Sequence, residues 1–395
     1  MNTIIKRSCS TTFFKNAFTF SNRLLLNATE SSVLEPRVAS TNDVSEFHIS
    51  MYPYLVRDGI LRLECNELNS VVKRFDDMCY YTGPERELSP SFVLLNFYKT
   101  LESPHRLTLE NFKLASLLAW SFEMIATGLI LEDDIMDNTK LRWKKKSYHE
   151  LQAIGLSALS DAKKLYMSAF RILRKYFKDN PAYVQLIDLL CKTMCTTSLG
   201  QSLDVNTNSE FKRTRNLNMF SYDRCKYIAK YKTGYMLYKG PPLAAMHLAE
   251  IHFNEFLEQF MQLCDKFATY RQAQDDVWDV YGDINVVGKL GSDITNGKCT
   301  WLIVTAMKYS NKQQLSLLQS HYGKEDVESQ TIIKRIYQEI DVLGKFEEYK
   351  REFIKEVQCD IPKISLKPLR DLCYEHIKQC VDINEQFVDY HTLIN

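Results

Sequence analysis

The chain has 395 residues, of which 45% are hydrophobic and 25% charged, and its formal net charge is +1. These proportions are typical of a globular protein with a sizeable core, and the near-neutral charge excludes a broad electrostatic attraction to nucleic acid. Only 13 Gly and 10 Pro occur, which is about half the usual share and favours long helices over many short strands.

The N-terminal segment, residues 1–43, differs in composition from the rest of the chain. It is basic and rich in Ser and Thr, and no acidic residue precedes Glu30. This composition favours a mitochondrial transit peptide, with a disordered tail as the alternative. We therefore predict a mitochondrial location if the segment is a targeting signal and a cytoplasmic one otherwise. The folded domain is expected at residues 44–395.

Helical periodicity recurs along this domain, and we find no strand-type alternation of useful length and no internal repeat. The two prolines after Gly240 are expected to kink or break a helix. The predicted helices are Leu61 to Cys79, Ser157 to Phe177, Tyr183 to Gly200, Phe220 to Tyr238, Asn254 to Tyr281 and Cys299 to Ser310. The fold class that follows is a single all-α domain.

One further helical segment, Leu114 to Leu131, is almost continuously apolar. It carries Glu123, runs directly into acidic residues and lacks the flanks of a membrane span. A helix that is apolar on all sides is expected in the centre of a bundle. We therefore predict a buried central helix, no stable membrane insertion, and a cavity at the acidic end.

The cysteines and histidines give no metal signature. Eleven cysteines occur without paired CxxC spacing, and the eight histidines are scattered. We expect reduced, mostly buried thiols.

Two aspartate-rich clusters have the same spacing, and each lies in a helical segment. They consist of Asp133, Asp134 and Asp137, and of Asp275, Asp276 and Asp279. Residues i and i+4 share a face of a helix, so the outer aspartates of each cluster point the same way. Two such faces opposite each other would form a cage of carboxylate oxygens. Mg²⁺ favours these ligands and usually shares its coordination shell with substrate phosphates, so the clusters predict a diphosphate site.

The clusters stand among further motifs in a fixed order. These are Gly200-Gln201-Ser202-Leu203-Asp204, Tyr231-Lys232-Thr233-Gly234, Gln272 to Asp283, Gly288 to Ile294 and Gly297 to Leu302. In order and spacing they resemble the trans-isoprenyl diphosphate synthases, the farnesyl diphosphate synthase-like family, over roughly residues 60 to 360. The resemblance implies an isoprenoid-synthase-type helical bundle around a deep apolar pocket, and a homodimer.

The resemblance also implies the roles of individual residues. It implies three Mg²⁺ ions, with Mn²⁺ as a substitute, bound between an allylic prenyl diphosphate and the two clusters. It assigns metal binding to Asp133, Asp134, Asp137, Asp275, Asp276 and Asp279, with the middle residue of each cluster as a minor ligand. It assigns substrate binding to Arg142, Gln201, Lys232, Thr233, Gln272, Lys289 and Lys298, with support from Asp204. It assigns the catalytic step, ionisation of the allylic diphosphate, to Asp133, Asp137, Lys232 and Asp275.

Several departures from the family pattern concern the site for a second substrate, isopentenyl diphosphate. Where the family has a Gly-Lys-x-x-Arg motif, this chain has Arg86 and Ser89 with two Glu residues beside them. Ala126 stands in place of a Gln or His, and Trp143 in place of a second Arg. Losing two or three charge-assisted contacts, at roughly 1.5–3 kcal/mol each, would weaken binding by orders of magnitude.

We therefore predict a Mg²⁺-dependent terpene synthase that converts farnesyl diphosphate to a sesquiterpene and releases diphosphate, with a C10 diphosphate as the alternative substrate. The chain resembles insect terpene synthases that look derived from farnesyl diphosphate synthase. Gly128 and Leu129, where synthases of farnesyl length commonly carry aromatics, predict a pocket deep enough for a C15 chain.

Two alternatives belong to other classes. The first is a short-chain prenyltransferase that makes geranyl or farnesyl diphosphate from isopentenyl diphosphate and an allylic diphosphate. The second is a non-catalytic partner subunit, which the six retained aspartates disfavour.

Overall fold

The structure is a computed structural model that describes residues 41–84, 86, 88–251 and 256–387. The predicted N-terminal extension lies outside the described residues as far as residue 40. Its targeting role stays a prediction.

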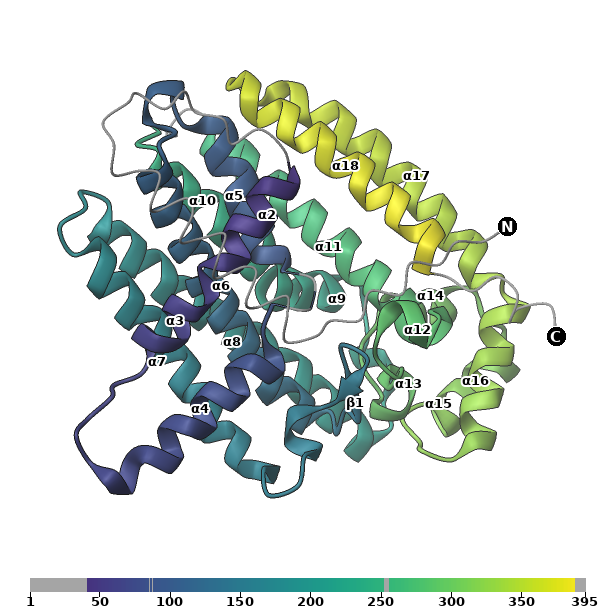
Figure 1. Cartoon of the computed structure of the whole chain (residues 1–395). Coiled ribbons are helices and arrows are strands. Elements are labelled where there is room, and N and C mark those ends of the chain that lie inside the picture. The colour runs from purple at the N-terminus through teal and green to yellow at the C-terminus, as the bar shows by residue number, and fades with distance from the viewer. Residues whose placement is uncertain (1–40, 85, 87, 252–255, 388–395) are drawn as a thin grey trace, which may run out of the picture.

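The described chain folds into a bundle of helices (Figure 1). In chain order they are α2 (Thr41–Ser50), α3 (Tyr52–Gly59), α4 (Asn69–Thr82), α5 (Ser89–Leu101), α6 (Leu109–Met136), α7 (Ala158–Phe177), α8 (Tyr183–Thr214), α9 (Tyr222–Ile228), the π-helix η7 (Ala229–Lys239), α10 (Gly240–Leu248), α11 (Leu257–Tyr281), α12 (Ile284–Val287), α13 (Asp293–Asn296), α14 (Trp301–Tyr309), α15 (Lys312–His321), α16 (Val327–Glu339), α17 (Val342–Asp360) and α18 (Lys367–Phe387). Short 3₁₀ turns join some of them, and the strands β1 (Leu141–Arg142) and β2 (Lys145–Lys146) form one antiparallel hairpin. The predicted all-α fold is confirmed.

Helix α6 is the predicted central helix, and it packs against α5, α7, α8 and α10. Thr108 caps its first turn by accepting a hydrogen bond from the backbone nitrogen of Asn111. Among the described residues α6 alone is long and apolar enough to cross a membrane, but 83% of its most apolar stretch is buried inside the protein. Its apolar surface is therefore used for packing, and its acidic C-terminal end reaches the cavity described below.

Several predicted helix limits were wrong. Helix α4 begins at Asn69 and not at Leu61, and residues 61 to 68 form an exposed segment before it. Helix α8 continues beyond Gly200 to Thr214. The segment predicted as one helix up to Tyr238 divides into α9 and the wider π-helix η7, and α10 begins at Gly240 with both prolines in its first turn. Proline is tolerated there because the first backbone N–H groups of a helix have no partner in the helix.

Helix α2, the first described helix, is held against α6 by His48. Its ring stacks on Trp120 with centroids 4.4 Å apart, and its Nδ1 lies 2.7 Å from the Ser116 hydroxyl. The indole nitrogen of Trp120 also donates to the His48 carbonyl at 2.8 Å. Burial lowers the pKa of His48 from 6.5 to about 3, so the folded protein holds this ring neutral.

The depressed pKa predicts the sign of a pH effect on stability. The unfolded chain takes up a proton on His48 below pH 6.5 while the folded chain does not, so the free energy of unfolding falls as the pH drops toward 3. We expect this residue to cost about 2 kcal/mol at pH 5 relative to neutral pH. In urea denaturation, His48→Gln should therefore lose stability less steeply between pH 7.5 and 5 than the wild type. Equal slopes for the two proteins would contradict this role.

Candidate active site

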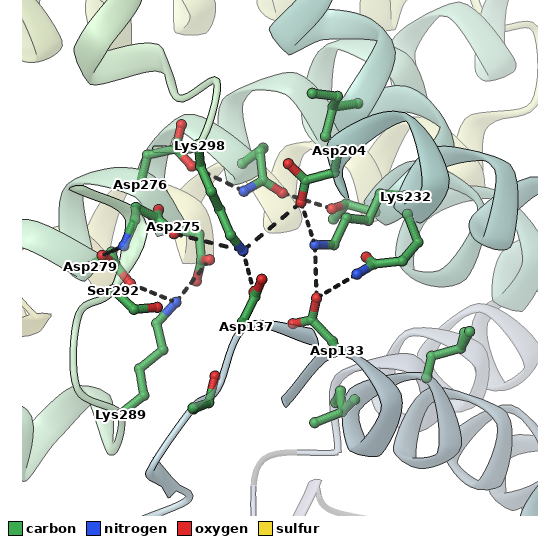
Figure 2. A pocket seen from close by; sticks show the side chains of 18 of the residues that line it. Asp133, Asp137, Asp204, Lys232, Asp275, Asp276, Asp279, Lys289, Ser292 and Lys298 are labelled. Atoms are coloured by element: carbon green, nitrogen blue, oxygen red, sulfur yellow. Dashed lines mark hydrogen bonds and ion pairs between the residues drawn. The ribbon is translucent and has the colours of Figure 1, made fainter. Parts of the chain in front are cut away.

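The two aspartate clusters face each other across one cavity of about 930 Å³ (Figure 2). The first cluster lies at the C-terminal end of α6 and the second in the last turns of α11. Every residue predicted to bind metal or substrate lines this cavity except Asp134. Apolar lining is supplied by Pro90, Ala126, Leu129, Ile130, Met236 and Leu237. The structure thus brings together nearly all of the site that the sequence predicted.

Asp133 is held by donors from two other helices. Its Oδ1 accepts hydrogen bonds from the Lys232 ammonium at 3.1 Å and from Gln201 Nε2 at 2.8 Å. The same ammonium donates to Asp204 at 2.8 Å. Burial alone would raise the pKa of Asp133, but the positive charges of Lys232, Lys298 and Arg142 hold it well below its usual range. Asp133 is therefore ionised.

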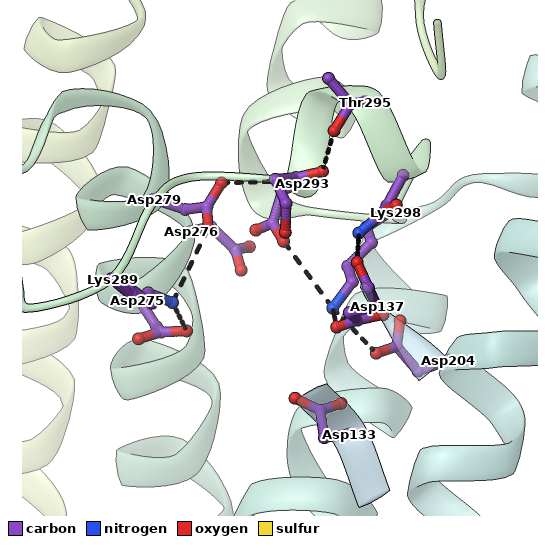
Figure 3. Close-up of polar contacts among 12 residues, drawn as sticks. Asp133, Asp137, Asp204, Asp275, Asp276, Asp279, Lys289, Asp293, Thr295 and Lys298 are labelled. Atoms are coloured by element: carbon purple, nitrogen blue, oxygen red, sulfur yellow. Dashed lines mark hydrogen bonds and ion pairs between the residues drawn. The ribbon is translucent and has the colours of Figure 1, made fainter. Parts of the chain in front are cut away.

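Lys298 links the first cluster to the opposite wall of the cavity (Figure 3). Its ammonium hydrogen-bonds to Asp137 and lies 3.9 Å from Asp204 and 3.8 Å from Asp293. Asp293 belongs to one of the sequence motifs, but its closeness to Lys298 depends on how the segment after α11 folds back, and no local pattern indicates it. A single cation thus neutralises carboxylates from three segments.

The second cluster is neutralised by a lysine from the segment that follows α12. Lys289 donates to Asp275 at 3.0 Å and lies 3.8 Å from Asp279. The backbone nitrogen of Asp293 donates to Asp279 at 2.9 Å. Burial raises the pKa of Asp275, and the charges of Lys289 and Arg271 more than offset this effect, so its pKa is about 2. Asp275 is thus ionised like Asp133.

The middle aspartate of each cluster bonds to the protein. Asp134 accepts from Arg142 Nε at 2.9 Å and does not line the cavity. Asp276 lines the cavity, but its two oxygens accept from Gln272 Nε2 at 3.0 Å and from the backbone nitrogen of Trp301 at 2.6 Å. Burial raises the pKa of Asp276 to about 7. The four outer aspartates are also bonded within the protein, but each lines the cavity and pairs with one of its lysines, so they remain the expected metal ligands.

The donor set fits Mg²⁺ bound together with a phosphate. Within the part of the chain that the structure describes, no three side chains of His, Cys, Asp or Glu converge to form a metal site on their own. Mg²⁺ is usually bound in this way, by one or two carboxylates plus substrate phosphates and water. The outer aspartates supply the carboxylates, and Lys232, Lys289 and Lys298 would then be available to phosphate oxygens. Thr233 donates to Gln272 at 2.8 Å and so holds the side chain that donates to Asp276.

Lys232 owes its position to a close approach between two backbones. A methyl group added at Gly200 on α8 would lie 2.1 Å from the backbone nitrogen of Lys232 on η7. Only glycine permits this contact. It places Lys232 directly beside the helix that carries Gln201 and Asp204, and the π-helical turn of η7 is typical of functional sites.

The cavity gains no depth from Gly128, contrary to our expectation. A methyl group added there would lie 2.4 Å from the ring of Tyr166, which comes from α7. The Tyr166 hydroxyl donates to Glu132 at 2.8 Å and fixes the ring in this position. The ring of Tyr166 thus fills the space that the missing side chain leaves. Leu129 does line the cavity, so it remains a determinant of the depth.

Arg86, the cation expected in the second-substrate site, is already paired. Its Nη2 donates to Glu123 and to Thr127, each at 2.8 Å, and its guanidinium lies 4.7 Å from the centre of the Trp143 ring. The side chains of Arg86 and Glu123 are 7% and 1% exposed. Sequence reasoning missed this pair, because Glu123 gave no signal beyond its place in an apolar helix. The two Glu residues beside Arg86 lie outside the described residues.

A short hairpin joins the two sides of the cavity. Trp143 and Lys144, at its tip, both have a positive φ, 51° and 63°, as a two-residue type I′ turn requires. The backbone nitrogen of Lys144 donates to the Gly288 carbonyl at 2.9 Å. The segment after the first cluster is therefore bonded to the segment after the second.

Two aromatic side chains near the end of α11 differ in their relation to the cavity. Trp278 lines the cavity, with the Arg271 guanidinium 4.3 Å from its ring centre. Tyr281 is buried away from the cavity lining and belongs to the core.

The chain is similar to several known proteins. The polyprenyl synthetase family matches residues 79–340. A farnesyl pyrophosphate synthase from Murgantia histrionica is 30% identical over 341 residues, which cover 86% of this chain and 82% of that protein. A geranyl diphosphate synthase from Ips pini is 28% identical over 305 residues, or 76% and 73% of the two chains. The structure of T. brucei farnesyl diphosphate synthase with a bisphosphonate superposes with a TM-score of 0.78 at 23% identity, covering 85% of this chain and 97% of that one.

The Gly200 contact predicts a strong effect of a small substitution. Gly200→Ala should push η7 away from α8 and displace Lys232. We expect the catalytic rate to fall on the order of 10²-fold, because moving a catalytic group by about 1 Å has an effect of this size. Gly59→Ala is the control, since its added methyl would meet Ser168 at 3.0 Å outside the cavity lining. Steady-state kinetics and thermal melting of both variants separate positioning from folding. Full activity of Gly200→Ala would show that the contact does not position Lys232.

Proposed function

Because this chain belongs to the polyprenyl synthetase family, we propose that it binds an allylic prenyl diphosphate through Mg²⁺ and breaks its C–O bond. The observation that carries the proposal is the opposition of Asp133 and Asp137 to Asp275 and Asp279 across one cavity lined by lysines. Family members use Mg²⁺ in general. The number of ions and the use of Mn²⁺ stay predictions.

The protein's own groups account for the ionisation. When the C–O bond breaks, both electrons stay on the diphosphate oxygen and an allylic carbocation remains. Bound Mg²⁺ would neutralise part of the charge that develops on the leaving group. The ammonium groups of Lys232, Lys289 and Lys298, which now contact aspartates, are placed to donate to the phosphate oxygens. The apolar part of the cavity keeps water away from the cation.

The relatives support prenyl transfer as the fate of this cation better than they support the terpene synthase that we expected from the sequence. They are named as farnesyl pyrophosphate synthases and a geranyl diphosphate synthase. We therefore propose as the first candidate a short-chain prenyltransferase. In its reaction the double bond of isopentenyl diphosphate attacks the allylic cation, and the adduct loses a proton.

A terpene synthase is the second candidate, and one observation favours it. Arg86 is hydrogen-bonded to the buried carboxylate of Glu123 and is covered by Trp143. The positive charge that a second diphosphate would need at this place is therefore already neutralised. Ionisation without a second diphosphate leaves cyclisation, proton loss or capture of water. The expected homodimer and cellular location stay predictions for both candidates.

Two incubations distinguish the candidates. With Mg²⁺, dimethylallyl diphosphate and isopentenyl diphosphate, a prenyltransferase should form geranyl or farnesyl diphosphate, detected by mass spectrometry. With Mg²⁺ and farnesyl diphosphate alone, a terpene synthase should release a sesquiterpene, detected by gas chromatography. EDTA should stop either reaction. If neither incubation releases diphosphate, the proposed ionisation is wrong.

The metal-binding roles predict a selective loss of turnover. Asp133→Asn and Asp275→Asn should each lower turnover at least about 10²-fold, because each removes a charged ligand of the leaving-group cage. Both variants should melt near the wild-type temperature, since these carboxylates line a cavity. Asp77→Asn, which alters an exposed ion pair with Lys73, is the control and should keep full activity. Turnover by Asp133→Asn and Asp275→Asn at the wild-type rate would refute the assignment.

A further inference from the structure

Two cysteine thiols lie side by side in the wall of the cavity. Cys225 belongs to α9, and Cys299 follows Lys298 directly in the segment before α14. Their sulfur atoms are 3.5 Å apart, and the Cys225 thiol also lies 3.2 Å from the Cys299 carbonyl oxygen. Both residues line the cavity, so a small molecule that enters the cavity can reach them.

A covalent bond between these sulfur atoms would disturb the diphosphate site. The sulfur atoms of a disulfide are about 2.05 Å apart, so the thiols would have to approach each other by about 1.5 Å. Cys299 is the neighbour of Lys298, which contacts Asp137. The backbone nitrogen of Trp301, two residues further on, holds Asp276. A shift of Cys299 would therefore displace groups on both sides of the cavity.

The other cysteine is connected to the site as well. Helix α9 continues directly into η7, which carries Lys232 and Thr233. A bond between Cys225 and Cys299 would thus tie together the two segments that supply Lys232 and Lys298.

We propose that Cys225 and Cys299 form a modification site at which a peroxide closes a disulfide and reversibly weakens diphosphate binding. One thiolate attacks an oxygen of hydrogen peroxide, the O–O bond breaks, and a sulfenic acid and hydroxide form. The second thiolate attacks the sulfenic sulfur and expels the hydroxyl group as hydroxide. Together the steps convert two thiols and one peroxide into one disulfide and two waters.

The surroundings of the pair explain why it rests in the reduced form. The hydrogen bond with Cys299 and burial raise the pKa of the Cys225 thiol well above its ordinary value. Because the thiolate is the nucleophile, the Cys225 thiol reacts slowly.

Peptide mapping tests the proposal without reference to the reaction that the protein catalyses. The full-length protein is treated with hydrogen peroxide, its remaining thiols are alkylated, and it is digested without reductant. We expect a linked peptide pair that contains Cys225 and Cys299, lighter by two hydrogen atoms than the sum of the free peptides. Cys225→Ser should not form it, whereas Cys359→Ser, which removes an exposed thiol on α17, should form it as the wild type does.

Calorimetry with inorganic pyrophosphate and Mg²⁺ measures whether the disulfide weakens diphosphate binding. Peroxide treatment should weaken binding by the wild type at least tenfold, and dithiothreitol should restore it. Treated Cys225→Ser should bind as its own untreated form does. The proposal is overturned if both thiols stay alkylatable, if they oxidise only to sulfinic or sulfonic acids, or if the linked protein binds pyrophosphate undiminished.

Discussion

The mutual repulsion of buried carboxylates, offset by three lysines, is the constraint on which the rest of the structure depends. The two clusters place several acidic groups in one cavity, where charges are poorly screened. Lys232, Lys289 and Lys298 come from three different segments, and each contacts at least two carboxylates. Without them, burial and repulsion would drive protons onto the aspartates and remove the charge that Mg²⁺ requires.

The backbone around the cavity is built to hold these lysines at fixed points. Gly200 lets η7 touch α8 and so fixes Lys232. The hydrogen bond from Lys144 to Gly288 joins the segments that follow the two clusters, and Lys289 is the next residue. The segment that carries Lys298 is held through Trp301 and Asp276. Cys299 lies within this last segment. A disulfide bond at Cys299 would therefore move Lys298 and alter how the carboxylates of the cavity are neutralised.

On the side of the cavity that carries Arg86, the positive charge is neutralised by a buried partner instead of by the aspartate clusters. The charge of Arg86 is matched by Glu123, which is buried inside α6. A second diphosphate that took Arg86 for itself would leave Glu123 without its partner, and breaking a buried pair in this way costs roughly 3–5 kcal/mol. A prenyltransferase would therefore have to bind its second substrate while the pair stays intact. For a terpene synthase the pair is no obstacle, since the apolar chain needs no cation there. Both reactions begin with the same ionisation, and the named relatives favour prenyl transfer as the step that follows it.

The sequence by itself determined the helical fold and the central helix, and it identified candidate site residues of which nearly all line one cavity. It did so because helical periodicity and the spacing of the aspartates are local patterns, and the order of the motifs carries the family resemblance. Only the tertiary structure decided that Tyr166 fills the space at Gly128, that Glu123 pairs with Arg86 and that Cys225 meets Cys299. Each of these is a close approach between residues far apart in the chain. Such contacts depend on how the helices pack and cross, and no local pattern in the sequence encodes that packing.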